Sequence, residues 1–226
     1  MSAEYIADLC RRHLEDQLTK SGSILYSAAA TLKPGRIYLL GLNPGGDEGL
    51  PLESAIDELP GKTSNAYIDE AWEQRGCSYK EGQAPLQDRV RWLVEVSPLA
   101  GKLEETCASN LIFRQTHDAG GLEFQKEGDR YWPIHEKILE IVNPSVIICF
   151  GNSARSPYAF LRDKLQAAER ESVPAGHGNW RLRSAEVRLS NGKRSCLLGI
   201  PHMSRYKPNG KKVVCEWITR NCAAHI

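Results

Sequence analysis

Two short loops in the sequence carry residues that could do chemistry. Residues 41–46 read GLNPGG and place Asn43 directly after an apolar run, IYLLGL. Residues 201–206 read PHMSRY and place His202 one residue after another apolar run, CLLGI. An Asn and a His that face one pocket form neither a catalytic triad nor a metal site. They suit a reaction that needs one positioned water and one hydrogen bond to a departing anion.

Buried strands must position both loops, because α/β proteins hold their ligands at the carboxyl ends of sheet strands. Apolar strands are expected at 36–42, 108–113 and 145–151, and Ser190-Asn191-Gly192 predicts a hairpin between two later strands. Helices are expected at 1–22, at 64–76, from Pro85, in PIHEKILEIV, at about 153–170 and at about 210–222, with 47–63 mostly a loop. This alternation predicts a three-layer α/β/α sandwich around a central, mostly parallel sheet.

Length and composition restrict the class of protein. With 226 residues, 41% of them hydrophobic, we expect one domain, residues 1–226, with the helix at 1–22 packed on it. The net charge of +1 argues against a histone-like protein but is compatible with a local basic patch. Without a long apolar run or a signal peptide, we expect a cytoplasmic protein without membrane contact.

Taken alone, GLNPGG also permits a purely structural interpretation. The motif lacks the Lys-Ser/Thr of a P-loop and the third glycine of the dinucleotide fingerprint, and Pro44 removes a backbone donor. A strand-end turn in which Asn43 adopts an unusual φ explains the motif equally well. The second loop favours the functional interpretation, provided that the two strands are neighbours in the sheet.

Four segments in chain order resemble motifs of the uracil-DNA glycosylase superfamily. GLNPGG is similar to the water-positioning motif of the branches with the form G-[IM]-N-P-G, which are the mismatch-specific, thymine-DNA and single-strand-selective monofunctional enzymes. PHMSRY resembles the second motif, H-P-S with a DNA-wedging loop, although Met203 replaces the usual Pro. ASNLIF is similar to the strand whose Asn reads the flipped base, and VIICFGNSA to the strand before the second motif.

The resemblance implies a uracil-DNA-glycosylase-like fold and a monofunctional DNA glycosylase that leaves an abasic site. Asn43 would orient the attacking water, and His202 would donate a hydrogen bond to the departing base. Asn110 would read the Watson–Crick edge of the base; its structural alternative is a strand-end Asn bonded to backbone. The residues expected to bind the base are Gly41, Leu42, Gly45, Gly46, Tyr67 and Asn110.

DNA is the implied partner, without an obligate protein partner. Arg205 or Tyr206 is the expected residue to fill the gap that a flipped base leaves, with Met203 as a third candidate. A basic flank after this loop suits phosphates, although a solvated helix start would have the same composition. The residues expected to bind DNA are Met203, Ser204, Arg205, Tyr206, Lys207, Lys211 and Lys212.

The sequence departs from the family at the wall of the base pocket. Relatives usually carry an aromatic residue shortly after the first motif, where this chain reads LESAIDEL, and Tyr67 is the nearest substitute. This puts uracil itself in doubt. The substrate is expected to be uracil or another modified pyrimidine, in DNA repair or, for a bulky modified cytosine of viral DNA, in antiviral defence. The cysteines lack the paired spacing of an iron–sulfur site, so no cofactor and no metal are expected.

Two other classes of function stay open at this point. One is a catalytically silent DNA-binding module of the same fold, which the intact Asn43 and His202 disfavour. The other is a nucleotide- or metabolite-binding α/β enzyme, for which the sequence shows no phosphate motif. Neither loop carries a Lys at its motif that could form a Schiff base with the sugar, so no lyase activity is expected.

Overall fold

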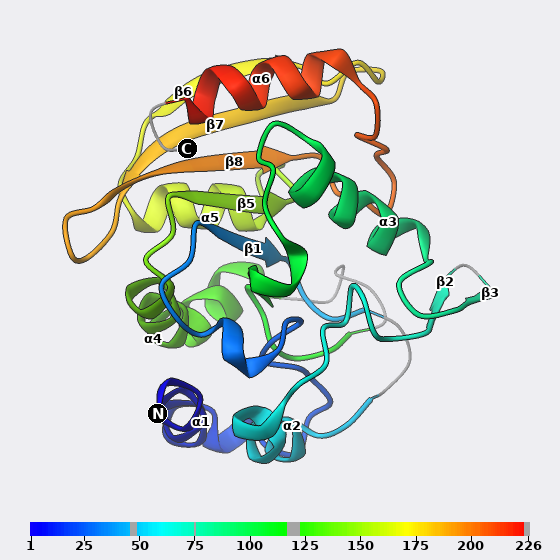
Figure 1. Cartoon of the computed structure of the whole chain (residues 1–226). Helices are drawn as coiled ribbons and strands as arrows, with labels where there is room; N and C mark the ends of the chain where they lie inside the picture. Colours follow the sequence, from blue (N-terminus) through cyan, green and yellow to red (C-terminus); the bar gives the residue numbers. More distant parts are fainter. Residues whose placement is uncertain (46–48, 75, 117–122, 224–226) are drawn as a thin grey trace.

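The structure, a computed structural model, describes residues 1–45, 49–74, 76–116 and 123–223. Its centre is a six-stranded sheet with the strand order β4-β1-β5-β8-β7-β6 (Figure 1). Four strands run parallel: β1 (Ile37–Gly41), β4 (Cys107–Asn110), β5 (Val146–Phe150) and β8 (Arg194–Ile200). β7 (Arg181–Arg188) and β6 (Glu169–Pro174) extend this sheet in antiparallel pairing.

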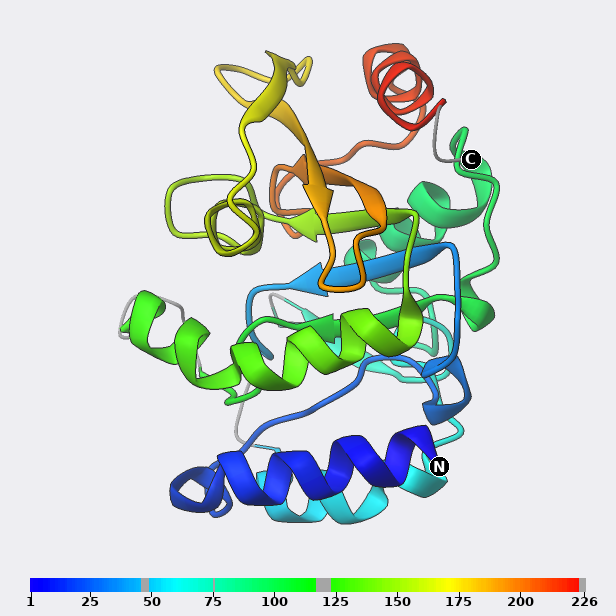
Figure 2. The ribbon, with the colours of Figure 1, turned by 90° about the vertical axis from the view of Figure 1, so that its left-hand side faces the viewer.

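Helices cover both faces of the sheet, which confirms an α/β protein with a central, mostly parallel sheet (Figures 1 and 2). Packed on one face are α1 (Ser2–His13), α2 (Leu52–Glu58), α4 (Phe124–Val142) and α5 (Pro157–Lys164). Packed on the other face are α3 (Pro85–Arg91), which continues as a π-helical stretch (Trp92–Val96), and α6 (Lys212–Cys222). The arrangement is consistent with three layers.

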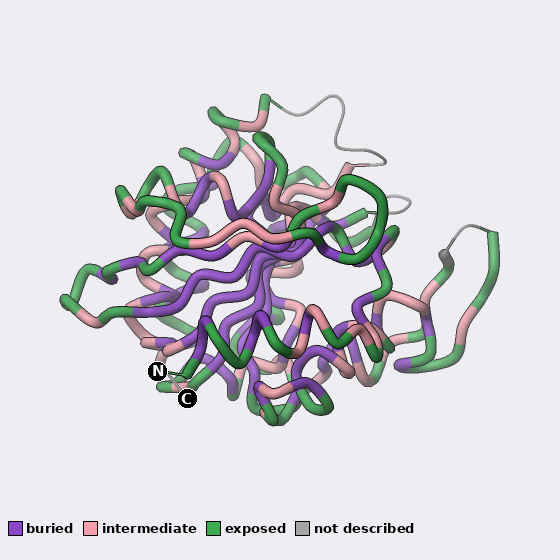
Figure 3. Tube along the Cα trace, turned by 90° about the horizontal axis from the view of Figure 1, so that it is seen from above, coloured by how far each residue is buried: buried purple, intermediate pink, exposed green. Residues whose placement is uncertain are grey.

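The central strands are apolar because both of their faces are buried (Figure 3). In β1, Tyr38 and Leu40 point into the core on the side of α4, whereas Ile37 and Leu39 point into the core on the side of α3. β5 alternates in the same way. A continuous apolar run is therefore the pattern that a doubly covered strand requires, and the expected strands at 36–42 and 145–151 are confirmed.

The expected helix at 64–76 is wrong. Asn65 starts a turn instead: its Oδ1 accepts from the backbone N–H of Tyr67 at 2.9 Å, and its own N–H donates to Asp69 at 2.7 Å. The chain then forms a hairpin of β2 (Trp72–Gln74) and β3 (Cys77–Tyr79), which projects from the body (Figure 3). Gly76 adopts φ +73°, so this glycine belongs to the hairpin turn and not to a helix end.

Other element boundaries differ by less. α1 ends at His13, far before residue 22, and a short 3₁₀ turn (Glu15–Gln17) follows it. The 47–63 segment, expected mostly as a loop, contains α2 and the 3₁₀ turn Leu59–Gly61, because Leu52 and Ile56 pack into the core. Two further 3₁₀ turns, Ala29–Thr31 and Leu103–Glu105, lie in connections. The hairpin at Ser190–Gly192, which joins β7 to β8, is confirmed.

In the part of the chain that the structure describes, no helix is long and apolar enough to cross a lipid bilayer.

Candidate functional site

The carboxyl ends of the four parallel strands lie along one edge of the sheet and carry the predicted residues. Asn110 ends β4, Asn43 follows β1 by two residues, and His202 follows β8 by two residues. β5 lies between β1 and β8, so the two strands that lead into the loops are not neighbours. The functional interpretation of the sequence had required these strands to be neighbours. At a spacing of ~4.8 Å per strand, β1 and β8 lie about 10 Å apart. The loops that carry Asn43 and Asn110 therefore follow neighbouring strands, whereas His202 lies across β5 from Asn43 and across both β1 and β5 from Asn110.

Asn43 is held in one orientation by its neighbours. Its Nδ2 donates to the carbonyl of Pro44 and to Oγ1 of Thr116, both at 2.8 Å. Because the Pro44 carbonyl can only accept, the nitrogen of the amide must face it. Both donor hydrogens are then occupied, and Oδ1 is the atom left to accept a hydrogen bond, for example from water. Thr116 lies 73 positions from Asn43, and no sequence motif connects the two.

Gln115, in the segment after β4, also holds the loop that carries Asn43 in place. Nε2 of Gln115 donates to the carbonyl of Gly45 at 3.0 Å, and Oε1 of Gln115 accepts from the N–H of Gly49 at 2.9 Å. Gly45 is exposed, and a Cβ built on it would meet no atom within 4 Å. Gly46, the other predicted glycine, lies outside the described residues. Gly45 thus leaves open space beside Asn43.

Asn110 is buried, with 5% of its surface exposed, and packs directly over Gly41. A Cβ on Gly41 would stand only 1.9 Å from Oδ1 of Asn110, so the glycine makes room for the amide. The backbone of Leu42 is paired here as well, since its carbonyl accepts from Ile112 at 2.9 Å. Nδ2 of Asn110 makes no hydrogen bond of ordinary geometry within the described ranges. An unpaired buried donor costs about 1–3 kcal/mol, which makes a ligand contact the natural use of this nitrogen.

The contacts of His202 define which of its ring nitrogens carries the proton. Its Nδ1 accepts from the backbone N–H of Ser204 at 3.2 Å and lies 2.8 Å from Oγ of the same serine. In the neutral ring the proton is therefore on Nε2, which is the available donor. The side chain reaches solvent, yet packing around the ring desolvates it and lowers its pKa, and the charge of Arg205 acts in the same direction. The environment favours the neutral imidazole.

The loop after His202 differs from the expectation at two residues. Met203 is fully buried, and Tyr206 is 1% exposed with its hydroxyl donating to the carbonyl of Ala175 at 2.6 Å. Neither side chain offers a surface to DNA; both anchor the loop to the core. Arg89 of α3 donates to the carbonyl of Met203 and fixes the loop further. Arg205 is exposed and is the predicted gap-filling residue that the structure leaves at the surface.

The basic flank is partly engaged within the protein. Nζ of Lys211 donates to the carbonyl of Gly176 at 2.9 Å and lies 5.8 Å from the ring centre of Tyr206. Nζ of Lys212 lies 3.5 Å from Glu216 one turn along α6, but 88% of the lysine side chain is exposed. Lys207 is exposed as well. Lys207 and Lys212 are thus the lysines of this flank that remain accessible.

Tyr67 lies inside a cluster of aromatic rings and not on its surface. Only 2% of its surface is exposed, and its ring centre lies 5.6 Å from Tyr26, 5.8 Å from Trp72 and 6.4 Å from Phe150. Tyr26 and Trp72 are the partly exposed members. Nothing in the sequence links residue 26 to the later motifs, so the contact of Tyr26 with Tyr67 could not be predicted.

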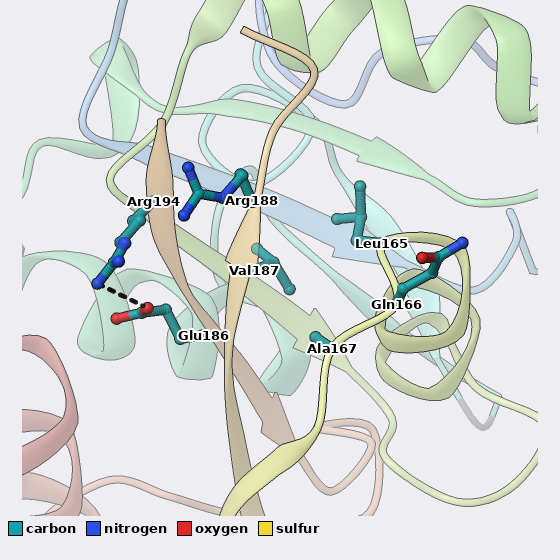
Figure 4. A pocket seen from close by; sticks show the side chains of 7 residues that line it. All are labelled: Leu165, Gln166, Ala167, Glu186, Val187, Arg188 and Arg194. Carbon is teal, nitrogen blue, oxygen red and sulfur yellow. Dashed lines mark ion pairs between the residues drawn. The ribbon is translucent and has the colours of Figure 1, made fainter. Parts of the chain in front are cut away.

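A small polar hollow of about 170 Å³ lies far from these residues (Figure 4). Its lining consists of Leu165, Gln166, Ala167, Glu186, Val187, Arg188 and Arg194. Arg194 starts β8, whereas His202 follows the other end of that strand, about 20 Å away at ~3.3 Å per residue. Glu186 and Arg194 form an ion pair at 3.4 Å in this hollow. We assign no functional role to it.

The edge of the sheet thus presents one acceptor on Asn43, one donor on His202 and one buried amide on Asn110. Over the described ranges, no group of three or more His, Cys, Asp and Glu side chains could hold a metal ion. No family model matches the chain, and no curated protein matches it significantly.

Proposed function

We propose that the protein is a monofunctional DNA glycosylase that hydrolyses the N-glycosidic bond of a flipped-out pyrimidine nucleotide and leaves an abasic site. The observation that carries the proposal is the orientation of two side chains at one edge of the sheet. Asn43 presents only an acceptor, because Thr116 and Pro44 occupy its nitrogen. His202 presents Nε2–H, because Ser204 occupies Nδ1. The resemblance of four motifs to the uracil-DNA glycosylase superfamily supports the same function.

The chemistry follows from these two groups. The bond between the sugar C1′ and the base nitrogen breaks, and its electron pair leaves with the base. The Nε2–H of His202 stabilises the negative charge on the base; one such donor contributes on the order of 3 kcal/mol to the transition state. Oδ1 of Asn43 orients a water whose oxygen bonds to C1′, and the released proton passes to solvent. No strong base is needed, because the oxocarbenium-like sugar is highly electrophilic.

Recognition of the base falls to Asn110, for whose amide Gly41 leaves room. The amide offers one donor and one acceptor, which match the paired groups on a pyrimidine edge. Uracil or another modified pyrimidine fits this description, including a bulky modified cytosine of viral DNA. The protein would then act in DNA repair or in antiviral defence.

The exposed residues around His202 supply the contacts to DNA in this proposal. Arg205 fills the gap in the stack, which offsets part of the few kcal/mol that base flipping costs. Lys207 and Lys212 contact phosphates. The buried Met203 and Tyr206 keep the loop in place and do not enter the duplex.

Base release from synthetic oligonucleotides tests the proposal. Single- and double-stranded oligonucleotides with uracil, thymine or modified cytosines are incubated with the protein, and free base and abasic sites are measured. Asn43→Ala should lower the single-turnover rate by about 100-fold or more with little change in DNA binding. His202→Ala should slow the release of bases that are poor leaving groups more than the release of good ones. A base that is stable as an anion needs less stabilisation by a hydrogen-bond donor.

Asn191→Ala, in the exposed hairpin turn at the opposite edge, is the matched control and should keep the wild-type rate. Binding without base release by the wild type would identify a silent DNA-binding module and overturn the proposal. Wild-type rates in both Asn43→Ala and His202→Ala would do the same. Borohydride should trap no covalent protein–DNA adduct, because neither loop offers a Lys beside Asn43 or His202.

A further inference from the structure

The turn between β6 and β7, residues 175–180, lies beside the loop that carries His202. β7 pairs with β8 in antiparallel register, with Arg183 opposite Gly199, so the start of β7 lies next to the end of β8. The turn is therefore at the same edge of the sheet as His202, on the side away from Asn43 (Figure 1).

Contacts with residues 201–212 hold this turn in place. The hydroxyl of Tyr206 donates to the carbonyl of Ala175 at 2.6 Å, and Nζ of Lys211 donates to the next carbonyl of the turn at 2.9 Å. The ring centre of Trp180 lies 6.0 Å from that of Tyr206. Within the turn, the N–H of Ala175 donates to the carbonyl of Trp180 at 2.8 Å. The turn and the loop after β8 thus form one connected surface.

The centre of the turn presents His177 to solvent. Gly176 and Gly178 flank this residue with φ of +67° and +50°, a backbone conformation that residues with a side chain rarely adopt. His177 itself is exposed, and its carbonyl accepts from the N–H of Trp180 at 3.1 Å. Because neither neighbour in the chain has a side chain, the space beside the His177 ring is left open on both sides along the backbone.

Trp180 supports the ring of His177 without enclosing it. The two ring centres lie 4.9 Å apart and the planes are inclined by 65°, so the edge of one ring meets the face of the other. Whichever ring provides the edge, at least one face of His177 is not covered by Trp180. Trp180 is half-buried and packs in turn on the buried Tyr206. An aromatic face supported from the core therefore remains at the surface.

The surroundings of this face carry positive charge. Residues 175–180 and 201–212 contain no Asp or Glu. The exposed Lys and Arg side chains of these two segments are Arg205, Lys207 and Lys212. An aromatic face beside cations is the combination with which proteins hold single-stranded nucleic acid, because bases stack on the ring while phosphates pair with the cations.

We infer that the turn between β6 and β7 is a second DNA-binding element, in which His177 stacks on an unpaired base of single-stranded DNA to one side of the flipped nucleotide. This inference rests on the proposed glycosylase function, and it adds an element outside all four motifs. Bases of a duplex keep their own stacking partners, whereas those of a single strand are free to stack on His177. Single-stranded DNA is therefore the form of substrate that gains from this contact.

Binding of oligonucleotides to the full-length protein tests the inference. The target position carries a tetrahydrofuran abasic analogue, so that no base is released during the measurement. His177→Ala should weaken binding of the single strand by about tenfold, the loss of one base–aromatic stack, and binding of the matching duplex by less than about threefold. His177→Phe keeps a flat ring and should bind within about twofold of the wild type, whereas His177→Gln should bind as weakly as His177→Ala. His13→Ala, an exposed histidine on α1, is the matched control and should bind like the wild type.

Two further measurements separate stacking from a charge contact and locate the base. The salt dependence of binding should keep its slope in His177→Ala, because stacking releases no counterions, whereas Lys207→Gln should reduce the slope by about one. Shortening the oligonucleotide on one side of the target position should abolish the effect of His177→Ala, and shortening it on the other side should not, because the turn lies on one side of His202.

Wild-type affinity in His177→Ala would overturn the inference. So would equal weakness of His177→Phe and His177→Ala, a reduced salt slope in His177→Ala, an equal loss on the duplex, or an effect that survives both truncations. Failure of the proposed function is a different result, because the wild type would then release no base from any oligonucleotide. The binding data would still decide whether a base stacks on His177.

Discussion

The position of the proton on His202 decides what the second loop can do. Ser204 donates its backbone N–H to Nδ1, and this contact requires a lone pair on that nitrogen. A second proton would turn Nδ1 into a donor facing another donor, and the turn would lose the hydrogen bond. The same contact therefore sets both the tautomer and the protonation state that the loop accepts.

The pH dependence of base release should reflect this arrangement. The pKa of His202 is lowered, first by desolvation and then by Arg205, so the neutral ring persists below the usual pKa of His, ~6.5. We expect a constant single-turnover rate at neutral pH and a decline only below that value. Arg205→Gln removes a positive charge that disfavours protonation of His202, so the rate of this variant should begin to decline at a higher pH.

The midpoint of the acid decline, and not the rate, is the quantity to compare, because Arg205→Gln also weakens DNA binding. Lys207→Gln removes a neighbouring positive charge and should leave the midpoint where the wild type has it. A wild-type decline that begins above the usual pKa of His would contradict the assigned state of His202.

At the scale of elements, the pairing of β1 with β4 places the Asn110 amide, which reads the base in the proposed function. Gly41 is opposite Asn110 in the parallel register, and the side chain of Asn110 occupies the space that a Cβ on Gly41 would need. The glycine at the end of β1 is thus required by its neighbouring strand and not by its own backbone angles.

Gly41→Ala should displace the Asn110 amide. The added Cβ would stand 1.9 Å from Oδ1, so the side chain must rotate or the strand end must shift. We expect base release to fall at least tenfold, together with a loss of stability of about 1–3 kcal/mol, which is typical of overpacking. Single-turnover rates and urea unfolding measure the two effects. Gly61→Ala is the control, since no atom lies within 4 Å of its Cβ; equal behaviour of the two variants would contradict this account.

At the scale of the whole molecule, a buried histidine links folding to pH. His135 of α4 lies beneath the end of β4, where Nε2 is 2.9 Å from the carbonyl of Leu111 and Nδ1 is 3.3 Å from the hydroxyl of Tyr38. Burial lowers the pKa of His135 to about 4. The unfolded chain, with a pKa near ~6.5, binds the proton more tightly than the folded protein does.

The free energy of unfolding should therefore fall as the pH drops from about 6.5 to about 4, by up to about 3 kcal/mol from this residue. Above pH 6.5 both states are neutral and the effect vanishes. Urea unfolding at pH 7 and at pH 4.5 measures it. His135→Gln should show a smaller loss between the two pH values than the wild type, whereas His13→Gln, exposed on α1, should not. An unchanged loss in His135→Gln would contradict the buried neutral state.

The sequence was sufficient to predict the elements that appear in it as continuous apolar runs or as a turn motif. β1, β5 and the β7–β8 hairpin follow from apolar runs and one turn motif, and the parallel sheet then places Asn43, Asn110 and His202 at one edge. Contacts between distant segments left no such signal. Thr116 reaches Asn43, and Tyr26 reaches β4, through pairings that the fold creates. The burial of Met203 depends on packing against α3 and its neighbours. In the 64–76 segment, side-chain turns at Asn65 override a helix-like pattern.

The place of β5 between β1 and β8 restricts how such a site can change during evolution. Backbone hydrogen bonds to β5 set the separation of the two loops, so a point substitution cannot shorten or lengthen it by a fraction of a strand width. Only insertion or loss of a whole strand would do that. Adaptation to a larger or smaller substrate must therefore proceed through the lengths and side chains of the loops, while the distance between their starting points is inherited unchanged.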